Sequence, residues 1–138
     1  MQEGKPLILI VDDDRGMAQF NSHLLERRGN STFVAHTSAQ AHSFVLENKP
    51  DMYVIDFELP DGDGISLCHY LRQISDAPIL FMTGRSKTTD IVLGLRAGGD
   101  YFLAKPYKKK EFIAVVTSLL RRAELTRKKT VSHLSKSQ

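Results

Sequence analysis

Aspartate, threonine and lysine side chains follow short apolar runs of this sequence, and together these residue types suit phosphoryl chemistry. Three aspartates occupy positions 12–14 directly after the first run, and Asp56 follows the third. Thr83 and Lys105 follow the fourth and fifth runs. Clustered carboxylates attract a hard divalent cation, a lysine stabilises charge on a phosphoryl group, and an aspartate can accept that group covalently. The set predicts metal-assisted phosphoryl transfer if the fold brings these residues together.

Crowded carboxylates carry an energetic cost. Two unit charges about 4 Å apart repel by ~4 kcal/mol at an effective dielectric constant of about 20. A bound cation or a proton must offset that repulsion. Mg²⁺ fits the pattern, because it favours one or two carboxylates together with waters and a substrate phosphate oxygen.

The five apolar runs predict the strands that position these residues. Each run is too short for a helix and lacks strict alternation, which is typical of strands buried on both faces of a parallel sheet. Apolar residues at helical spacing lie between the runs, for example Ile91, Val92 and Leu95 before the fifth. Strands that alternate with helices favour an α/β fold with helices on both faces. The predicted strands are Leu7–Val11, Thr32–Ala35, Met52–Ile55, Ile79–Met82 and Tyr101–Ala104.

Parallel strands end at one edge of the sheet, and ligands of open α/β folds bind outside that edge. The chemistry-bearing residues follow four of the five predicted strands, so we expect them to meet there. The second run is followed by His36 and Thr37, which add nothing comparable and suit an edge strand.

The composition is typical of one globular domain. The chain has 138 residues, of which 41% are hydrophobic and 25% charged. Cys68 is the single cysteine, which excludes an internal disulfide and a cysteine-based zinc site, and we expect it in the core. No apolar run approaches the ~20 residues of a membrane helix, and the start does not resemble a signal peptide. We therefore expect no membrane partner and a cytoplasmic location.

Charge is distributed unevenly along the chain. Residues 1–106 carry 10 Lys/Arg and 14 Asp/Glu, whereas residues 107–138 carry 9 and 2. The helical pattern fades near Thr126, so we predict an N-terminal tail at 1–6, one domain at 7–125 and a basic tail or linker at 126–138. The lysines at 108–110 form either an exposed charged face or a docking patch for an acidic partner. No recognition helix is present, so we expect no direct nucleic-acid binding by these residues.

Four separated motifs carry a family resemblance: Val11–Asp14, Ile55–Gly64, Met82–Gly84 and Ala104–Tyr107. In type, order and spacing they closely resemble the receiver domain of two-component response regulators, over roughly residues 6–124. The resemblance implies a flavodoxin-like (βα)5 three-layer sandwich with a parallel five-stranded sheet of order 2-1-3-4-5. It also implies a signalling domain rather than a metabolic enzyme.

The resemblance implies a phosphoacceptor and a metal site. Asp56 would accept a phosphoryl group from a phosphohistidine on a sensor histidine kinase or a phosphotransfer protein. Asp13, Asp56 and the backbone carbonyl of Glu58 would ligate Mg²⁺, and Asp12 would assist through water. Asp14 is interpreted as a helix cap or a supporting acid, not a ligand.

It also implies a switch. Thr83 would hydrogen-bond the phosphoryl group after transfer, and Lys105 would pair first with the Asp56 carboxylate and then with the phosphoryl group. Phe102 would rotate inward when Thr83 moves. The change would reach the surface formed by the fourth helix, fifth strand and fifth helix, where an output domain, an effector protein or a second copy of the chain would bind.

Two further interpretations concern the loops at this site. We hypothesise that Glu58 and Arg85 form a pair that controls access of the hydrolytic water and sets the phosphate lifetime. The acidic segment Asp61–Gly64 lacks the spacing and closing glutamate of an EF-hand, so we predict a loop entering the third helix.

Two alternatives from other classes remain. The chain could be a degenerate receiver that acts as a phosphorylation-independent interaction module, although the complete acceptor set argues against that. It could also be a Mg²⁺-dependent phosphatase with Asp56 as nucleophile. That class usually has a second aspartate two residues later, where this chain has Glu58, and the length leaves little room for a substrate-covering domain.

Overall fold

The main sheet is parallel and has five strands. A computed structural model describes residues 4–84 and 88–136, with side chains as far as residue 128. The strands are β1 (Leu7–Val11), β2 (Ser31–Ala35), β3 (Met52–Asp56), β6 (Ile79–Thr83) and β7 (Tyr101–Ala104). They pair in the order β2-β1-β3-β6-β7, which in chain order is the predicted 2-1-3-4-5. The flavodoxin-like α/β fold is therefore confirmed.

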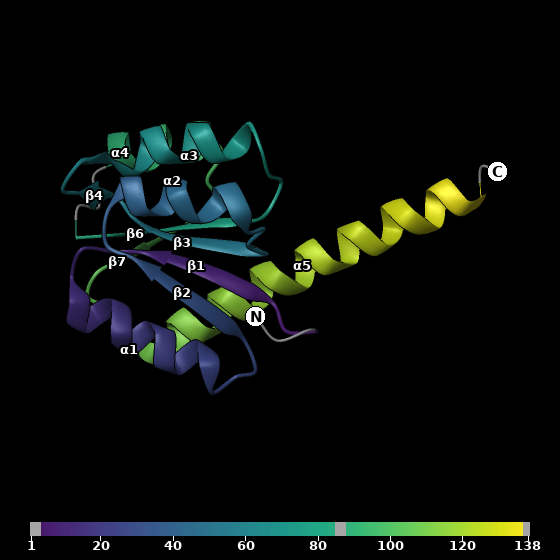
Figure 1. The fold of residues 1–138 in the computed structure, drawn as a ribbon, viewed down its shortest axis with the longest axis horizontal. Helices are drawn as coiled ribbons and strands as arrows, with labels where there is room; N and C mark the ends of the chain where they lie inside the picture. Colours follow the sequence, from purple (N-terminus) through teal and green to yellow (C-terminus); the bar gives the residue numbers. More distant parts are fainter. Residues whose placement is uncertain (1–3, 85–87, 137–138) are drawn as a thin grey trace.

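Helices cover both faces of this sheet (Figure 1). One face carries α1 (Arg15–Glu26) and α5 (Lys109–Lys136). The other carries α2 (Ser38–Glu47), α3 (Gly64–Arg72) and α4 (Thr88–Arg96). The result is a three-layer sandwich in which strands of the main sheet alternate with helices along the chain.

Alternate residues of the central strands supply two separate cores. Leu9 and Tyr53 pack toward α2 and α3, whereas their neighbours Ile8 and Val54 pack toward α1 and α5. Every residue of β1, β3 and β6 is buried, which explains why these runs lack polar alternation. Cys68 is fully buried in the first core, as predicted.

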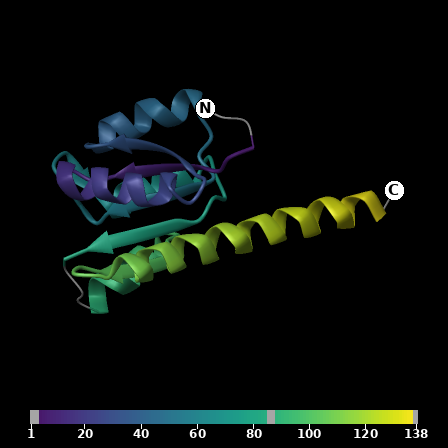
Figure 2. The ribbon, with the colours of Figure 1, turned by 90° about the horizontal axis from the view of Figure 1, so that it is seen from below.

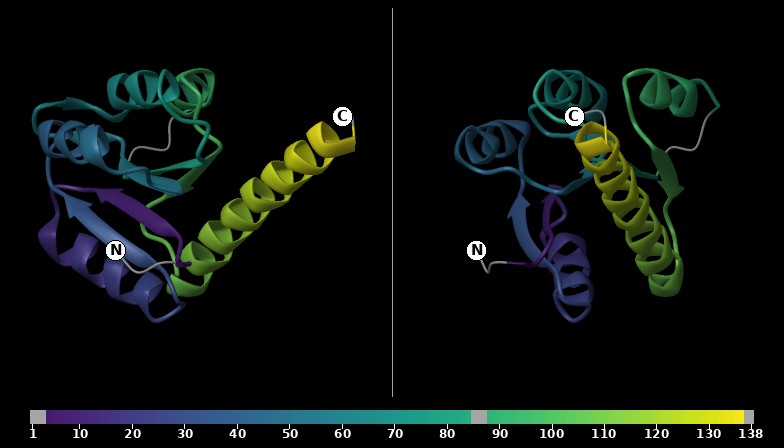
Figure 3. Two further views of the ribbon diagram at one scale, coloured as in Figure 1. Left: turned by 45° about the vertical axis from the view of Figure 1, so that its right-hand side comes forward. Right: turned by 90° about the vertical axis from the view of Figure 1, so that its right-hand side faces the viewer.

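The last helix is longer than the sequence pattern predicts. α5 continues through Lys136 and runs past the other elements (Figures 2 and 3). The segment is free of glycine and proline, and Glu124 pairs with Arg127 and Lys128 one turn later, which supports the helix. Residues 126–136 are thus helical, and their use as a tail or linker stays a prediction. Within the described ranges no helix, α5 included, is apolar enough to span a membrane.

The three lysines at 108–110 lie exposed at the start of α5. Glu111 in the first turn accepts a hydrogen bond from the Lys108 N–H (3.3 Å) and places negative charge where the helix dipole favours it. The exposed charged face is confirmed, and docking of an acidic partner on it stays a prediction.

A short antiparallel hairpin lies between β3 and α3, where the sequence predicted only a loop. Its strands are β4 (Glu58–Leu59) and β5 (Gly62–Asp63), with Pro60 and Asp61 at the turn. The pairing involves two residues on each side, too few to give a recognisable alternation. Asp63 then caps α3 by accepting a hydrogen bond from the Ser66 N–H (2.7 Å).

The helix predicted from Ile91, Val92 and Leu95 is present as α4, but its apolar residues do not provide its buried face. Val92 and Leu95 are 40% and 44% exposed, and the residue of α4 that is buried is Gly94. The rings of Phe81 and Phe102 fill the space beneath it. A Cβ at position 94 would lie 2.6 Å from the Phe102 ring and 3.3 Å from the Phe81 ring, so only a residue without a side chain fits.

This packing predicts opposite effects of one substitution at two helical glycines. Gly94→Ala forces the Phe102 ring out of its contacts, and we expect it to lower the free energy of unfolding by about 1 kcal/mol through overpacking. Gly16→Ala in α1 is the matched control. A Cβ there meets nothing closer than 3.7 Å, so we expect a gain of up to about 1 kcal/mol from helix propensity. Urea unfolding followed by circular dichroism measures both, and an equal gain at the two positions would contradict the packing described.

Candidate functional site

Three carboxylates meet at the carboxyl edge of the sheet. Asp12 and Asp13 follow β1, and Asp56 is the last residue of the neighbouring strand β3. One carboxylate oxygen from each lies within 4.8 Å of those of the other two. The geometry therefore brings together the three aspartates that the sequence proposed as metal ligands.

Burial makes this arrangement costly without a counter-ion. Asp12 and Asp56 are only 4% and 7% exposed, whereas Asp13 faces solvent. The pKa of Asp12 is raised to about 6. Burial is the main cause and the nearby Asp56 adds to it, whereas the hydrogen bond from the Asp14 N–H and the charge of Lys105 act in the opposite direction. Hard oxygen ligands that repel one another in this way fit a divalent cation, since its charge removes the repulsion.

Among the described residues, Lys105 provides the positive charge beside the buried carboxylates. Its Nζ donates to the Asp56 carboxylate (2.9 Å) and lies 3.9 Å from that of Asp12. Burial acts to lower the pKa of Lys105, but the hydrogen bond and charge of Asp56 and the charge of Asp12 outweigh it and leave the pKa raised. Lys105 is therefore a fixed positive charge directed at the Asp56 carboxylate.

Thr83 and Glu58 complete the edge. Thr83 ends β6, is fully buried, and accepts a backbone hydrogen bond at its carbonyl from the Lys105 N–H (2.7 Å). The Glu58 N–H donates to an oxygen of Asp56 (2.9 Å), so the start of the β4–β5 hairpin lies against the central aspartate. The side chain of Glu58 is exposed. Arg85, its hypothesised partner, lies outside the described residues.

Phe102 occupies an inward position beneath α4. Its ring centroid lies 5.3 Å from that of Phe57 and 5.4 Å from that of Phe81, and Gly94 leaves room for it. Phe57 directly follows Asp56, so the predicted switch residue packs one residue away from the central aspartate. The rotation itself stays a prediction.

Asp14 has the capping role that the sequence indicated. Its carboxylate accepts from the Met17 N–H in the first turn of α1 (3.0 Å). The Asp14 N–H in turn donates to the Asp12 carboxylate (2.9 Å). Asp14 thus supports a proposed ligand from the backbone.

Some supporting contacts were missed by the sequence analysis. Asn21 of α1 is buried and donates to the Tyr107 hydroxyl (2.9 Å), which fixes the segment after Lys105. His36 contacts the Asp12 carbonyl (3.0 Å), and Asp61 contacts the start of α2. The turn-forming sequence Pro60–Gly62 was the available signal for Asp61, but its partner lies over twenty residues away.

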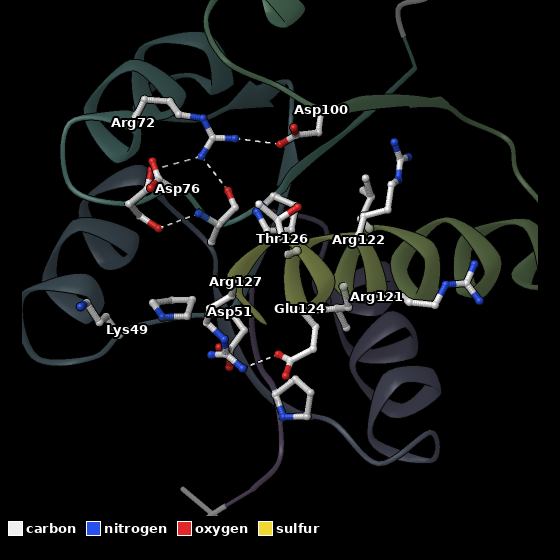
Figure 4. Close-up of a pocket in the computed structure, with 18 of the residues that line it drawn as sticks. Lys49, Asp51, Arg72, Asp76, Asp100, Arg121, Arg122, Glu124, Thr126 and Arg127 are labelled. Carbon is white, nitrogen blue, oxygen red and sulfur yellow. Dashed lines mark hydrogen bonds and ion pairs between the residues drawn. The ribbon is translucent and has the colours of Figure 1, made fainter. Parts of the chain in front are cut away.

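A cavity of about 1340 Å³ opens at the opposite edge of the sheet, between residues 119–127 of α5 and the loops that precede the strands (Figure 4). Arg72 lies in it and donates to the Gly98 and Ala77 carbonyls and to the Asp100 carboxylate. These hydrogen bonds of Arg72 connect the loops that line the cavity. The acidic cluster at the carboxyl edge is the better candidate for chemistry.

Comparison with known proteins agrees with this geometry. The sequence matches the family described as response regulator receiver domain over residues 8–117. It is 41% identical over 117 residues to the DNA-binding response regulator MtrA of Mycolicibacterium smegmatis, covering 85% of this chain and 51% of MtrA. The chain thus spans about half the length of that relative.

Solved structures agree as well. A two-component response regulator from Clostridium difficile superimposes with a TM-score of 0.83 at 34% identity, covering 86% of this chain and 98% of that one. A CheY-like receiver domain protein from Methanospirillum hungatei gives 0.86 at 23% identity, over 89% and 99%, and supports the fold alone. The chain belongs to the receiver domain family of two-component response regulators, which are signalling domains rather than classical enzymes.

The raised pKa of Asp12 predicts how the stability of the metal-free protein depends on pH. Its pKa is about 6 in the folded chain against an ordinary 3.8, so between these values the folded chain holds a proton that the unfolded chain lacks. The free energy of unfolding should therefore rise as the pH falls through about 6. Asp12→Asn removes this group and should be more stable than the native chain at about pH 7.5, with the difference shrinking toward about pH 5.

Urea unfolding in the presence of a chelator, at several pH values, measures that difference. Titrating groups that do not interact with Asp12 are common to both proteins and cancel in the comparison. A native-minus-variant difference that does not change with pH would show that Asp12 is not the titrating group.

Proposed function

We propose that this receiver accepts a phosphoryl group on Asp56 from a phosphohistidine of a sensor histidine kinase or phosphotransfer protein, in a Mg²⁺-dependent reaction. The observation that most supports this proposal is the hydrogen bond from Lys105 Nζ to the Asp56 carboxylate (2.9 Å), next to Asp12 and Asp13. Asp56 and Lys105 are 49 residues apart in the sequence, and the pair Asp12 and Asp13 belongs to a third segment, so the edge of the sheet brings the three segments together.

The donor set fits Mg²⁺. Asp13, Asp56 and the backbone carbonyl of Glu58 would hold the ion, and Asp12 would act through a bound water. Bound there, Mg²⁺ supplies positive charge that offsets the carboxylates and the transferring phosphoryl oxygens. Oxygen ligands without sulfur or nitrogen favour a hard ion of this kind over zinc or copper.

The chain's own residues perform the transfer by position and charge. A carboxylate oxygen of Asp56 forms the new bond to phosphorus while the bond from phosphorus to the donor imidazole nitrogen breaks. The imidazole leaves with the electron pair and takes up a proton from water. Lys105 offsets the developing negative charge, and the Thr83 hydroxyl donates to a phosphoryl oxygen. Hydrolysis of the resulting acyl phosphate returns Asp56 to its carboxylate.

The switch would connect this event to a distant surface. Movement of Thr83 toward the phosphoryl group, with Phe102 held inward against Phe57, would alter the face formed by α4, β7 and α5. That face exposes apolar side chains, which suits a partner. Output domains, effector proteins and a second copy of the chain are the candidates. The large apolar residues exposed in α4 and β7 are Val92, Leu93, Leu95 and Tyr101.

The proposed function also includes control over the lifetime of the phosphoryl group on Asp56. The exposed carboxylate of Glu58 follows Asp56 by two residues and would limit access of the hydrolytic water together with Arg85. Exchange of either residue should change the rate of dephosphorylation if the pair acts in this way.

A longer protein is the setting that we propose for this domain. The relative named as DNA-binding is about twice the length of the matched segment, which supports an output domain beyond residues 7–125. The tail at 1–6 would precede the domain, and the segment 126–138 would then be the linker. Nucleic-acid binding would belong to the output domain and not to these residues. The cytoplasm is the location that we expect.

A direct labelling experiment tests the central step. With Mg²⁺ and phosphoramidate or acetyl phosphate as small donors, intact-mass spectrometry should show one added phosphoryl group on the native chain. Asp56→Asn should show none, because its amide lacks the nucleophilic oxygen. A chelator should abolish labelling of the native chain.

The outcomes separate the alternatives. A native chain that stays unlabelled would overturn the proposal and favour a degenerate interaction module. Multiple turnover of general phosphate esters, with release far exceeding one equivalent, would favour the phosphatase reading instead.

A further inference from the structure

The turn of the β4–β5 hairpin is fixed to a helix that is remote in sequence. The two carboxylate oxygens of Asp61 accept hydrogen bonds from the backbone N–H groups of Ser38 (2.8 Å) and Ala39 (2.9 Å). These are the first two residues of α2. The same hydrogen bonds lower the pKa of Asp61, so the carboxylate stays ionised near neutral pH.

Asp61 completes the cap of α2. A helix begins with four N–H groups that lack intrahelical partners. In α2 the Ala41 N–H makes the first intrahelical bond, to the Thr37 carbonyl, and the Gln40 N–H donates to the Thr37 hydroxyl (3.1 Å). The N–H groups of Ser38 and Ala39 have no such local acceptor and donate to Asp61. Two of the first three helical N–H groups are therefore satisfied by the hairpin, and the two elements are coupled.

The first turn of α2 is also connected, through His36, to the loop that carries Asp12. Gln40 accepts from the His36 N–H (2.6 Å), and the His36 Nδ1 donates to the Asp12 carbonyl (3.0 Å). The first turn of α2 thus lies between the loop that carries Asp12 and the hairpin that carries Glu58. It forms a brace between two segments of the candidate metal site.

The hairpin depends on such an anchor. It has two residues in each strand, and an isolated two-stranded hairpin is marginally stable in water. Leu59 is buried in the core, but Glu58 and Asp61 are exposed, so the polar half of the hairpin is held mainly by backbone and carboxylate contacts. Mg²⁺ demands near-ideal octahedral geometry, and a loosely held carbonyl ligand would bind it weakly.

We propose that Asp61 is a positioning residue for the metal site: by fixing the hairpin to the first turn of α2, it holds the Glu58 carbonyl and the loop after Asp56 in place for the cation. The inference rests on the proposed function, since it concerns the affinity of the same site for Mg²⁺.

Two variants of Asp61 test the inference, with Mg²⁺ alone as the probe and isothermal titration calorimetry as the readout. Asp61→Ala removes both acceptors and should weaken Mg²⁺ binding about tenfold, the usual effect of losing a supporting contact at a metal site. Asp61→Asn keeps one acceptor oxygen and should weaken binding by about threefold. Both lose the same charge, so the difference between them reports geometry.

Thr37→Ala is the matched control. It removes a cap from the same helix but leaves the hairpin anchored, so the Kd for Mg²⁺ should stay within about twofold of the native value. Amide hydrogen exchange of metal-free protein gives a second readout. The Glu58 N–H should exchange faster in Asp61→Ala than in the native chain, and at the native rate in Thr37→Ala.

Each contrary outcome is informative. Equal affinities in Asp61→Ala and Asp61→Asn would reduce the role of Asp61 to its charge and overturn the inference. An unchanged Kd for Mg²⁺ in Asp61→Ala would also overturn the inference. The same holds if Thr37→Ala weakens Mg²⁺ binding as much as Asp61→Ala does. A native chain that binds no Mg²⁺ would refute the proposed metal site itself, and this result is distinct because it appears without any substitution.

Discussion

The mutual repulsion of carboxylates at one sheet edge is the constraint on which the rest of the structure depends. Asp12 and Asp56 are buried beside Asp13, and their oxygens lie within 4.8 Å of one another. At an effective dielectric constant of about 20, each such pair costs ~4 kcal/mol at 4 Å. Lys105 offsets part of this cost, and its raised pKa reflects that interaction. The remaining negative charge favours binding of a cation at this edge of the sheet. A phosphoryl group could then bind beside that cation.

The packing of the parallel sheet compensates for the unfavourable energy of this carboxylate cluster. β1 and β3 are buried on both faces and pair in register, so Asp12 and Asp56 are held at their positions by two hydrophobic cores. Supporting contacts come from each side. The Asp14 N–H donates to Asp12, the Glu58 N–H donates to Asp56, and Lys105, which directly follows β7, donates to Asp56. The stability of the cores is what allows charged groups to be kept together for chemistry.

The sequence predicted this site well, because the rule that places it is topological. Apolar runs identify buried strands, and residues that follow parallel strands must meet at one edge. Asp12, Asp56 and Lys105 are therefore found together as expected. The helices were predicted less accurately. In α4 the buried residue is Gly94, and apolar spacing cannot reveal a face whose space is filled by rings from β6 and β7.

The contacts that escaped prediction are polar and long-range. The two hydrogen bonds of Asp61 to α2 join residues more than twenty positions apart, and the turn-forming sequence around Asp61 does not reveal its partner. The hairpin that presents Asp61 is too short for a strand signal. Near the other end of the chain, helix propensity and the ion pairs of Glu124 extend α5 beyond its apolar pattern, because a helix can continue without a core to pack against.

The most direct measurement of the central claim is the free energy of unfolding as a function of Mg²⁺ concentration, with NaCl at matched ionic strength as reference. If the clustered carboxylates form a cation site, stability should rise by about 1.4 kcal/mol for each tenfold increase in Mg²⁺ above the Kd. The rise should be absent in Asp13→Asn. A native chain whose stability responds equally to Mg²⁺ and to matched NaCl would contradict the account.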